Sequence, residues 1–201
     1  MTTSQLNREK NSQIGQNRTY KTNKKMTTKF LNPAAVVAQS GIMQGQTVAD
    51  LGCGNGFYVL PAAQMVGPTG TVLAVDVQES KLAATVSISN QFGYKNVRIL
   101  QADLTKPLLD IPAHSCDMVI VSNILHEINS QTELIKNIYR ILKSPGRLVA
   151  VEWKRTATPF GPPLDKRLDQ QKLEVLLMQT GFRKDKDLEA DGYHYAVLFE
   201  K

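Results

Sequence analysis

The chain has 201 residues, of which 42% are hydrophobic, and this is enough to form one compact domain with a buried core. Its longest apolar runs are strand-sized, far short of the roughly 20 residues of a membrane-spanning helix, and its first residues lack the apolar segment of a secretory signal. We therefore expect no membrane span and a cytoplasmic location, and the net charge of +6 raises the question of a nucleic-acid partner.

The charge is concentrated at the start of the chain. Residues 1–30 hold seven basic side chains and one acidic side chain, whereas the rest of the chain is balanced. This polar composition predicts a flexible basic tail that precedes a folded domain at residues 31–201. A nucleic-acid-binding arm is the alternative, but Tyr20 is the only aromatic residue before Phe30 that could stack on a base.

The domain begins with a helix and then alternates between strands and helices. Asn32 and Pro33 are typical of a helix start, and Gly41 can end that helix. The apolar runs predict strands at residues 47–51, 71–77, 96–103, 116–125 and 147–153. The helical spacing of apolar residues and the Gly and Pro breakers predict helices at residues 57–65, 79–92, 131–142 and 168–180.

The predicted strands are apolar almost throughout, which is typical of strands buried on both faces of a parallel sheet. Their alternation with helices predicts a doubly wound α/β sheet. After the last helix, two short runs flank the turn "EADG" at residues 189–192. This pattern predicts a hairpin that adds an antiparallel strand.

A glycine-rich loop follows the first strand in "VADLGCGNGF". Gly52, Gly54 and Gly56 permit a tight turn where a ligand can touch the backbone. The spacing G-x-G-x-G differs from the G-x-G-x-x-G of dinucleotide sites, and Asp50 stands two residues before the first glycine. A carboxylate at that place repels a pyrophosphate and attracts an ammonium group.

Two further carboxylates end the next two strands. Asp76 is placed to accept hydrogen bonds from ribose hydroxyls, and Asp103 is placed to accept one from the exocyclic amine of adenine. A ribose, an adenine and a cationic amino group together describe S-adenosylmethionine better than NAD. Converging carboxylates also suit a sulfonium cofactor.

These motifs, in the order "DLGCGNG", "AVD", "QADL", "CDMV" and "LKSPGRL", resemble the class I S-adenosylmethionine-dependent methyltransferases from about residue 33 to the C-terminus. The resemblance implies a Rossmann-like sheet of about seven strands, mostly parallel with an antiparallel last strand. It also implies that Asp50, Gly52, Gly54 and Gly56 hold the methionine part of the cofactor. The remaining implied contacts are Asp76 with the ribose, Val77 and Leu104 on either side of the adenine, Asp103 with its amino group, and Asn123 beside the methionine and the reacting methyl group.

A general base is sought after the fourth strand, where His126 and Glu127 are adjacent. The near-neutral pKa of histidine suits this role, so both are candidate catalytic residues. Neighbouring helical residues point about 100° apart, so the two side chains need not touch each other. In the alternative interpretation they cap or orient the following helix. His194 is either part of the acceptor pocket or an ordinary strand residue.

No metal site is predicted, because no pair of histidines has the spacing of ligands. Cys53 and Cys116 form no C-x-x-C motif, so we expect two reduced thiols, with Cys53 as a small filler of the loop. Arsenite-methylating relatives rely on several cysteines, which this chain lacks. The Asn/Asp-Pro-Pro-aromatic motif of nucleobase N-methyltransferases is also missing after the fourth strand.

Residues 153–167 contain Trp153, Phe160 and paired prolines, and we expect this loop to cover an acceptor site. The segment resembles small bacterial and archaeal relatives of the quinone-biosynthesis methyltransferases. The sequence therefore predicts methyl transfer from S-adenosylmethionine to a small-molecule acceptor. The alternatives are an RNA or other macromolecule methyltransferase recruited by the basic tail, a non-catalytic cofactor-binding module, and an NAD-dependent dehydrogenase. The sequence predicts no particular oligomeric state.

Overall fold

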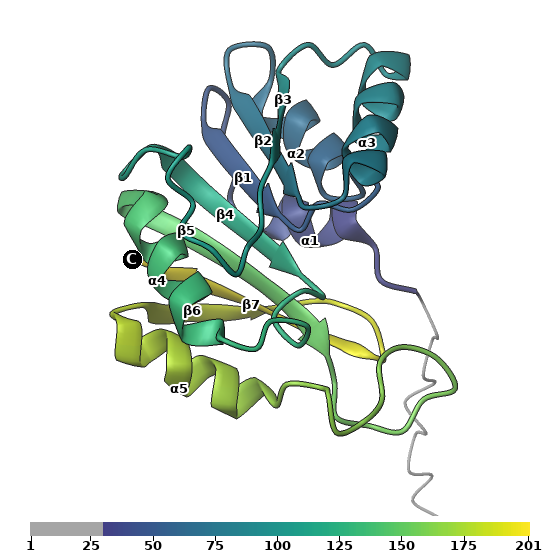
Figure 1. The fold of residues 1–201 in the computed structure, drawn as a ribbon, viewed down its shortest axis with the longest axis vertical. Coiled ribbons are helices and arrows are strands. Elements are labelled where there is room, and N and C mark those ends of the chain that lie inside the picture. Colours follow the sequence, from purple (N-terminus) through teal and green to yellow (C-terminus); the bar gives the residue numbers. More distant parts are fainter. Residues whose placement is uncertain (1–29) are drawn as a thin grey trace, which may run out of the picture.

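A computed structural model describes residues 30–201, so the predicted basic tail at residues 1–30 lies outside the described residues except for Phe30. The domain is built on a seven-stranded sheet of strand order β3-β2-β1-β4-β5-β7-β6 (Figure 1). The strands are β1 (Thr47–Leu51), β2 (Thr71–Asp76), β3 (Val97–Gln101), β4 (Cys116–Ser122), β5 (Leu142–Trp153), β6 (Arg183–Leu188) and β7 (His194–Glu200). Strands β1 to β5 pair in parallel, and β7 is antiparallel to both of its neighbours, which confirms the predicted fold class.

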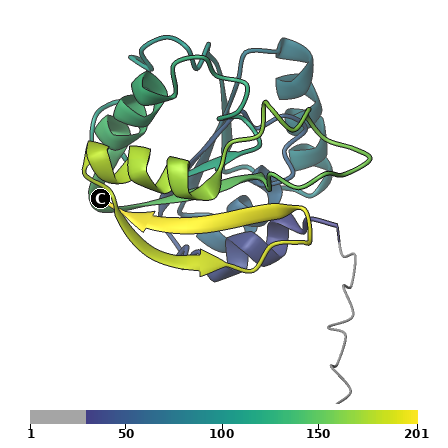
Figure 2. The same cartoon turned by 90° about the horizontal axis from the view of Figure 1, so that it is seen from below.

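Five helices within residues 30–201 cover the two faces of the sheet: α1 (Pro33–Gln39), α2 (Val59–Val66), α3 (Glu79–Gln91), α4 (Gln131–Ile141) and α5 (Gln170–Thr180). Helices α1, α2 and α3 contribute to one core cluster, and α4 and α5 contribute to the other. A second view shows α5 and α1 on opposite sides of β7 (Figure 2). The sheet is therefore doubly wound, as the alternation of elements predicts.

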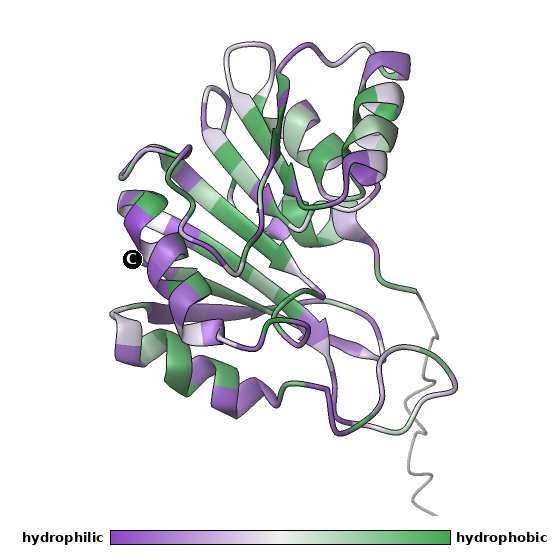
Figure 3. Cartoon of the chain, in the orientation of Figure 1, coloured by the Kyte–Doolittle hydropathy of each residue, from purple (hydrophilic) through white to green (hydrophobic). Residues whose placement is uncertain are grey.

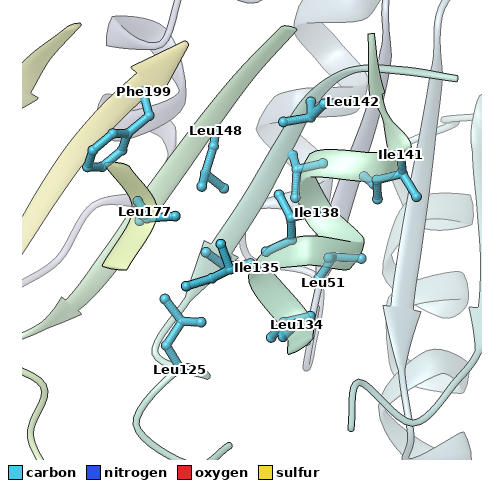
Figure 4. Packing of buried hydrophobic residues seen from close by; sticks show 14 of the residues in the cluster. Leu51, Leu125, Leu134, Ile135, Ile138, Ile141, Leu142, Leu148, Leu177 and Phe199 are labelled. Atoms are coloured by element: carbon cyan, nitrogen blue, oxygen red, sulfur yellow. The ribbon is translucent and has the colours of Figure 1, made fainter. Parts of the chain in front are cut away.

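Strands β1, β2 and β4 are largely apolar because successive side chains enter different cores, whereas the edge strand β6 is mostly charged and exposed. In β1, Val48 packs in the cluster with α1 and α2, whereas Ala49 and Leu51 pack in the cluster with α4 and α5. Hydrophobic colour accordingly fills the central strands and the inner sides of the helices (Figure 3). Leu134, Ile135 and Ile138 of α4 meet Leu51 across the second cluster (Figure 4).

The helix caps follow the sequence signals. The side chain of Asn32 accepts a hydrogen bond from the N–H of Ala35 at the start of α1, and Asp169 accepts two at the start of α5. Gly181 ends α5 with φ of 111°, a conformation that favours glycine.

Several element boundaries differ from the prediction; strand β4, for example, ends at Ser122 rather than at residue 125. Helix α2 begins at Val59 rather than Phe57, because the glycine loop continues as turns through residue 58. Strand β5 begins at Leu142 rather than residue 147, since Leu142 already pairs with Cys116 before a register shift around "SPG". No helix in residues 30–201 combines the length and apolar character needed to cross a membrane.

The core makes a stability prediction. Ile138 is fully buried in the cluster with α4, so Ile138→Ala should lower the free energy of unfolding by about 2–5 kcal/mol through lost burial and a residual cavity. Lys136→Ala on the exposed side of the same helix is the control and should change it by less than about 0.5 kcal/mol. Urea denaturation measures both, and similar losses for the two variants would contradict the assignment of this core.

Candidate functional site

A cavity of about 450 Å³ opens at the carboxyl ends of β1 and β4, the two central strands of the sheet. The connections from these strands diverge, because α2 packs on one face and α4 on the other. The strand order reverses at this point, which is where open α/β sheets bind ligands. The cavity is lined by residues 52–55, 57 and 58 of the glycine loop, Asp50, Lys81 of α3, Ser122 and Asn123, together with Leu31 and Pro33 from the start of the domain.

The start of the glycine loop stays hydrogen-bonded to the end of β2. The N–H groups of Gly52 and Cys53 donate to the carbonyl oxygen of Val75 over 2.8 and 2.9 Å. A Cβ atom on Gly52 would lie 2.9 Å from Ile124, whereas a Cβ atom on Gly54 would meet only open space. Both residues have positive φ, so glycine is required for the turn and leaves the backbone at Gly54 free to approach a ligand.

Asp50 is the buried carboxylate of this cavity. It is 1% exposed, and its Oδ2 atom has no hydrogen-bond partner among residues 30–201. Burial, with a further contribution from the negative charge of Asp76, raises the pKa of Asp50 to about 7. An unpaired buried carboxylate is costly, and a cationic ligand group would relieve that cost.

Two more polar atoms of the cavity lining, besides Asp50 Oδ2, lack a hydrogen-bond partner. Tyr58 Oη and Asn123 Oδ1 are buried without partners, so three of the four such side-chain atoms found in residues 30–201 belong to this cavity lining. Buried polar groups are normally hydrogen-bonded, so these atoms mark where a polar ligand fits. Tyr58 is absent from the predicted site. Its sequence signal is a hydroxyl-bearing aromatic residue directly after the glycine loop.

Asp76 lies beside the cavity and organises its wall. Its Oδ2 accepts a hydrogen bond from the N–H of Gly54, and its Oδ1 accepts one from the N–H of Gln78, both over 2.9 Å. Gly54 lines the cavity, so Asp76 connects the end of β2 to the glycine loop. Gly56 faces away, because a Cβ atom there would lie 3.0 Å from Thr85 of α3.

Asp103 lies farther out. It is exposed beyond the end of β3, and its Oδ1 accepts hydrogen bonds from the hydroxyl and the N–H of Thr105, which lower the pKa of Asp103. Of the two predicted adenine neighbours, Val77 is 56% exposed at the end of β2, whereas Leu104 is 6% exposed and packs in the core with α4. The structure thus brings Asp50, the glycine loop and Asn123 together, places Asp76 and Val77 at their edge, and turns Leu104 inward.

His126 has a different carboxylate partner from the predicted one. Its Nδ1 lies 2.8 Å from Oε2 of Glu152, a fully buried residue of β5, whereas Glu127 is 63% exposed with Oε1 3.8 Å from Nε2. The hydrogen bond to Glu152 raises the pKa of His126. Ser122 pairs with Val151, so Glu152 lies beside the turn that follows β4. The signal in the sequence is the lone acidic residue in the apolar run "RLVAVEW".

His194 lies behind Asn123. Its Nε2 is 3.3 Å from Asn123 Nδ2, its Nδ1 is 2.8 Å from Oδ1 of Asp191, and its ring is 4.0 Å from that of Trp153. The antiparallel register pairs Trp153 with His194, so the histidine lies at the edge of the sheet where β5 ends. His194 therefore supports the cavity wall from behind.

The loop after β5 is organised by one buried arginine. Arg167 donates to the carbonyl oxygens of Lys154, Thr156, Phe160 and Pro162 and to the hydroxyl of Thr158, and it lies over the Trp153 ring. Phe160, at the tip of this loop, contacts three aromatic rings: Phe30, Trp153 and Tyr193. Figure 1 shows this connection at the same edge as the ends of the parallel strands.

Comparisons with known proteins agree with this geometry. Residues 42–186 match the family model described as "Methyltransferase domain". The ubiquinone/menaquinone biosynthesis C-methyltransferase UbiE of Escherichia fergusonii is 32% identical over 157 residues, which cover 78% of this chain and 59% of that protein. The chain thus matches less than two thirds of that relative's length.

Two solved structures share the fold. A SAM dependent methyltransferase from Aquifex aeolicus superposes with a TM-score of 0.78 at 27% identity, over 85% of this chain and 90% of that one. An arsenic (III) S-adenosylmethionine methyltransferase from Chlamydomonas reinhardtii gives a TM-score of 0.62 at 21% identity, over 79% of this chain and 64% of that one. The second likeness concerns the fold alone.

The His126–Glu152 pair makes a prediction about pH and stability. Because the pKa of His126 is raised in the folded state, its protonated form stabilises the fold below pH 6.5, and this contribution is lost as the pH rises through the folded-state pKa. The free energy of unfolding of His126→Gln should therefore fall furthest below that of the wild type at pH 5.5–6, and the difference should shrink toward pH 8.5. Glu127→Gln is the control: its exposed carboxylate is screened by solvent and raises the pKa of His126 less than Glu152 does, so the substitution should change the profile much less than His126→Gln.

Proposed function

The chain belongs to the class I S-adenosylmethionine-dependent methyltransferases, and from this premise we propose that it methylates a small aromatic acceptor on carbon. Its cofactor is S-adenosylmethionine. The proposal concerns which residues hold that cofactor and what receives the methyl group.

We place the methionine part of the cofactor in the cavity at the ends of β1 and β4. The fit rests on the three unpartnered polar atoms there: Asp50 Oδ2, Tyr58 Oη and Asn123 Oδ1. An ammonium group can donate to the two carbonyl-type acceptors, and the tyrosine hydroxyl can donate to a carboxylate. Ionised Asp50 would then form a charge-assisted pair with the ammonium group.

The nucleoside part would extend toward the ends of β2 and β3. Each oxygen of Asp76 accepts one backbone hydrogen bond and retains a second lone pair, so Asp76 can also accept from ribose hydroxyls. Exposed Val77 can contact the adenine, and Asp103 can accept a hydrogen bond from its amino group. Leu104 would support this wall from the core without presenting much surface to the ligand.

One observation carries the acceptor class: a wall of aromatic rings adjoins the cavity. Trp153, Phe160 and Tyr193 contact one another through Phe160, and Phe30 joins them. Trp153 is linked to the cavity through His194 and Asn123, and Phe30 precedes the lining residue Leu31. Planar aromatic molecules pack well on such rings. The similar UbiE protein is named as a C-methyltransferase, which favours carbon as the acceptor atom.

The bound cofactor supplies a methyl group on a sulfonium, which is a good leaving group. The protein therefore contributes mainly by holding the acceptor carbon in line with the methyl group and by excluding water. Methylation of carbon would form a carbon–carbon bond at the expense of the sulfur–methyl bond, and the acceptor ring would release a proton to solvent.

In this proposal, His126 and Glu127 do not have the role of general base that the sequence predicts. The histidine is absent from the cavity lining formed by the described residues, and its Nδ1 is engaged with the buried carboxylate of Glu152 over 2.8 Å. We therefore assign His126, with Glu152, to holding the turn after β4. A hydroxyl on the acceptor ring can supply the electron density for attack without a protein base.

Arsenite is a poor candidate for the acceptor. The two thiols of the chain are buried, and burial raises the pKa of Cys53 to about 12 and also raises that of Cys116. Neither thiolate is therefore accessible for binding arsenic near neutral pH.

The acceptor class can be tested with isotopically labelled cofactor. We expect the full chain to transfer labelled methyl to a 1,4-dihydroxynaphthalene with an unsubstituted ring carbon, with the label on carbon when the product is examined by NMR. Total RNA is the second acceptor, with a chain truncated before residue 30 for comparison. Labelled RNA that depends on residues 1–29, with no methylated ring, would instead favour the macromolecular alternative.

The cofactor site makes a prediction about pH. Because the pKa of Asp50 is about 7, its carboxyl group is mostly protonated at lower pH and must lose that proton before it can pair with an ammonium group. The association constant of S-adenosylhomocysteine should therefore rise about tenfold per pH unit from 5.5 toward 7 and then level off. Isothermal titration calorimetry measures this, and binding at pH 6 should release a proton.

Asp50→Asn should flatten that profile and weaken binding at pH 7.5 by about 1.5–3 kcal/mol, the range for a hydrogen bond to a charged group. Asp110→Asn, an exposed carboxylate elsewhere, is the matched control and should behave as the wild type. A wild-type affinity that does not vary between pH 5.5 and 7.5 would place the ammonium group away from Asp50.

A further inference from the structure

Three polar side chains, two of them buried, form a series of hydrogen bonds from the hairpin at the end of the fold to the cavity. Asp191 Oδ1 lies 2.8 Å from His194 Nδ1, and His194 Nε2 lies 3.3 Å from Asn123 Nδ2. The side chains of Asp191 and His194 are 2% and 6% exposed. Asp191 precedes β7, whereas Asn123 follows β4 about 70 residues earlier, so only the folded sheet brings them together.

The donor and acceptor groups of these three side chains determine the direction of each hydrogen bond between them. A carboxylate can only accept, so His194 must carry a proton on Nδ1. In the neutral imidazole Nε2 is then an acceptor, and it must receive an N–H from the Asn123 amide. The carbonyl side of that amide, Oδ1, is consequently turned away from His194 and is buried without a partner in a residue that lines the cavity.

Further contacts hold the three side chains in place. The backbone N–H groups of Tyr193 and His194 also donate to Asp191 Oδ1, and the Trp153 ring packs on His194. Asn123 adopts φ of 55°, a left-handed conformation that asparagine tolerates better than most residues, and its N–H donates to Val151. The orientation of the amide is thus set by groups that do not themselves line the cavity.

The orientation matters because the two faces of an amide have opposite polarity. Because Nδ2 is engaged with His194, Oδ1 is the atom of the Asn123 amide that remains without a partner and can accept from a ligand, as Asp50 Oδ2 can. A reversed amide would present N–H donors, which repel a cation. The hydrogen-bond chain therefore makes the cavity complementary to an ammonium group.

We propose that Asp191 and His194 are positioning residues that hold the Asn123 amide with its carbonyl oxygen toward the cavity and so select the ammonium group of the cofactor. This inference rests on the proposed placement of the methionine part in that cavity. It assigns a role in cofactor selection to the β6–β7 hairpin, which lies outside the glycine loop and the acidic strand ends.

Paired ligands test the proposal: S-adenosylhomocysteine and its analogue that lacks the α-amino group, titrated by calorimetry at pH 7.5. The wild type should prefer the amino-bearing ligand. His194→Phe and Asp191→Ala should each reduce the affinity for that ligand by about tenfold and leave the affinity for the deaminated analogue unchanged. Asp191→Asn should retain the preference, because its side-chain carbonyl can still accept from Nδ1.

The controls are His114→Phe and Asp185→Ala, two exposed residues remote from the chain of hydrogen bonds, and both should match the wild type. A second measurement does not depend on the variants. Nitrogen-15 NMR of the wild type should show His194 protonated on Nδ1 alone. Protonation on Nε2, alone or in addition, would overturn the inference.

The outcomes separate the two proposals. A wild-type preference that persists in both His194→Phe and Asp191→Ala would overturn the positioning role and leave the cofactor placement intact. Equal loss for both ligands in these variants would also overturn it, since the cavity as a whole would then depend on the pair. A wild type without preference, together with an Asp50→Asn variant of wild-type affinity, would refute the placement itself.

Discussion

The site depends on one constraint, the divergence of the chain at the carboxyl ends of β1 and β4. These strands pair in parallel in the centre of the sheet, but the helices that follow them pack on opposite faces. The backbone cannot cover the gap between the two exits, so a cavity remains there. The glycine loop, Asp50, Tyr58 and Asn123 meet at this cavity because each belongs to one of the two exits.

Carboxylates at this edge of the sheet differ in what they can do, because their surroundings differ. Burial raises the pKa of Asp50 to about 7, and no described residue pairs with its Oδ2. Burial alone would also raise the pKa of Asp191, but hydrogen bonds from His194 and from backbone N–H groups outweigh burial and lower it. The first carboxylate is available to a cationic ligand, whereas the second is committed to holding a histidine.

The antiparallel end of the sheet supports the same edge. Because β7 runs against β5, the start of β7 lies beside the end of β5, and Trp153 pairs with His194. The hairpin therefore provides a second layer behind Asn123, while the loop held by Arg167 provides aromatic rings beside it. A strand that continued the parallel pattern would place its first residues at the opposite edge.

The sequence by itself determined the layered fold, the family and the cofactor, because these depend on local signals: apolar runs, helix caps, a glycine loop and acidic residues at strand ends. It also predicted Asp50 as a site residue from those signals and Asn123 through the family resemblance, and both line the cavity. Tertiary structure decided which residues the side chains of the site contact. Glu152 rather than Glu127 holds His126, Asp191 and His194 orient Asn123, and Leu104 turns into the core. Strand register between segments far apart in the chain sets these contacts, and spacing within one segment carries no information about that register.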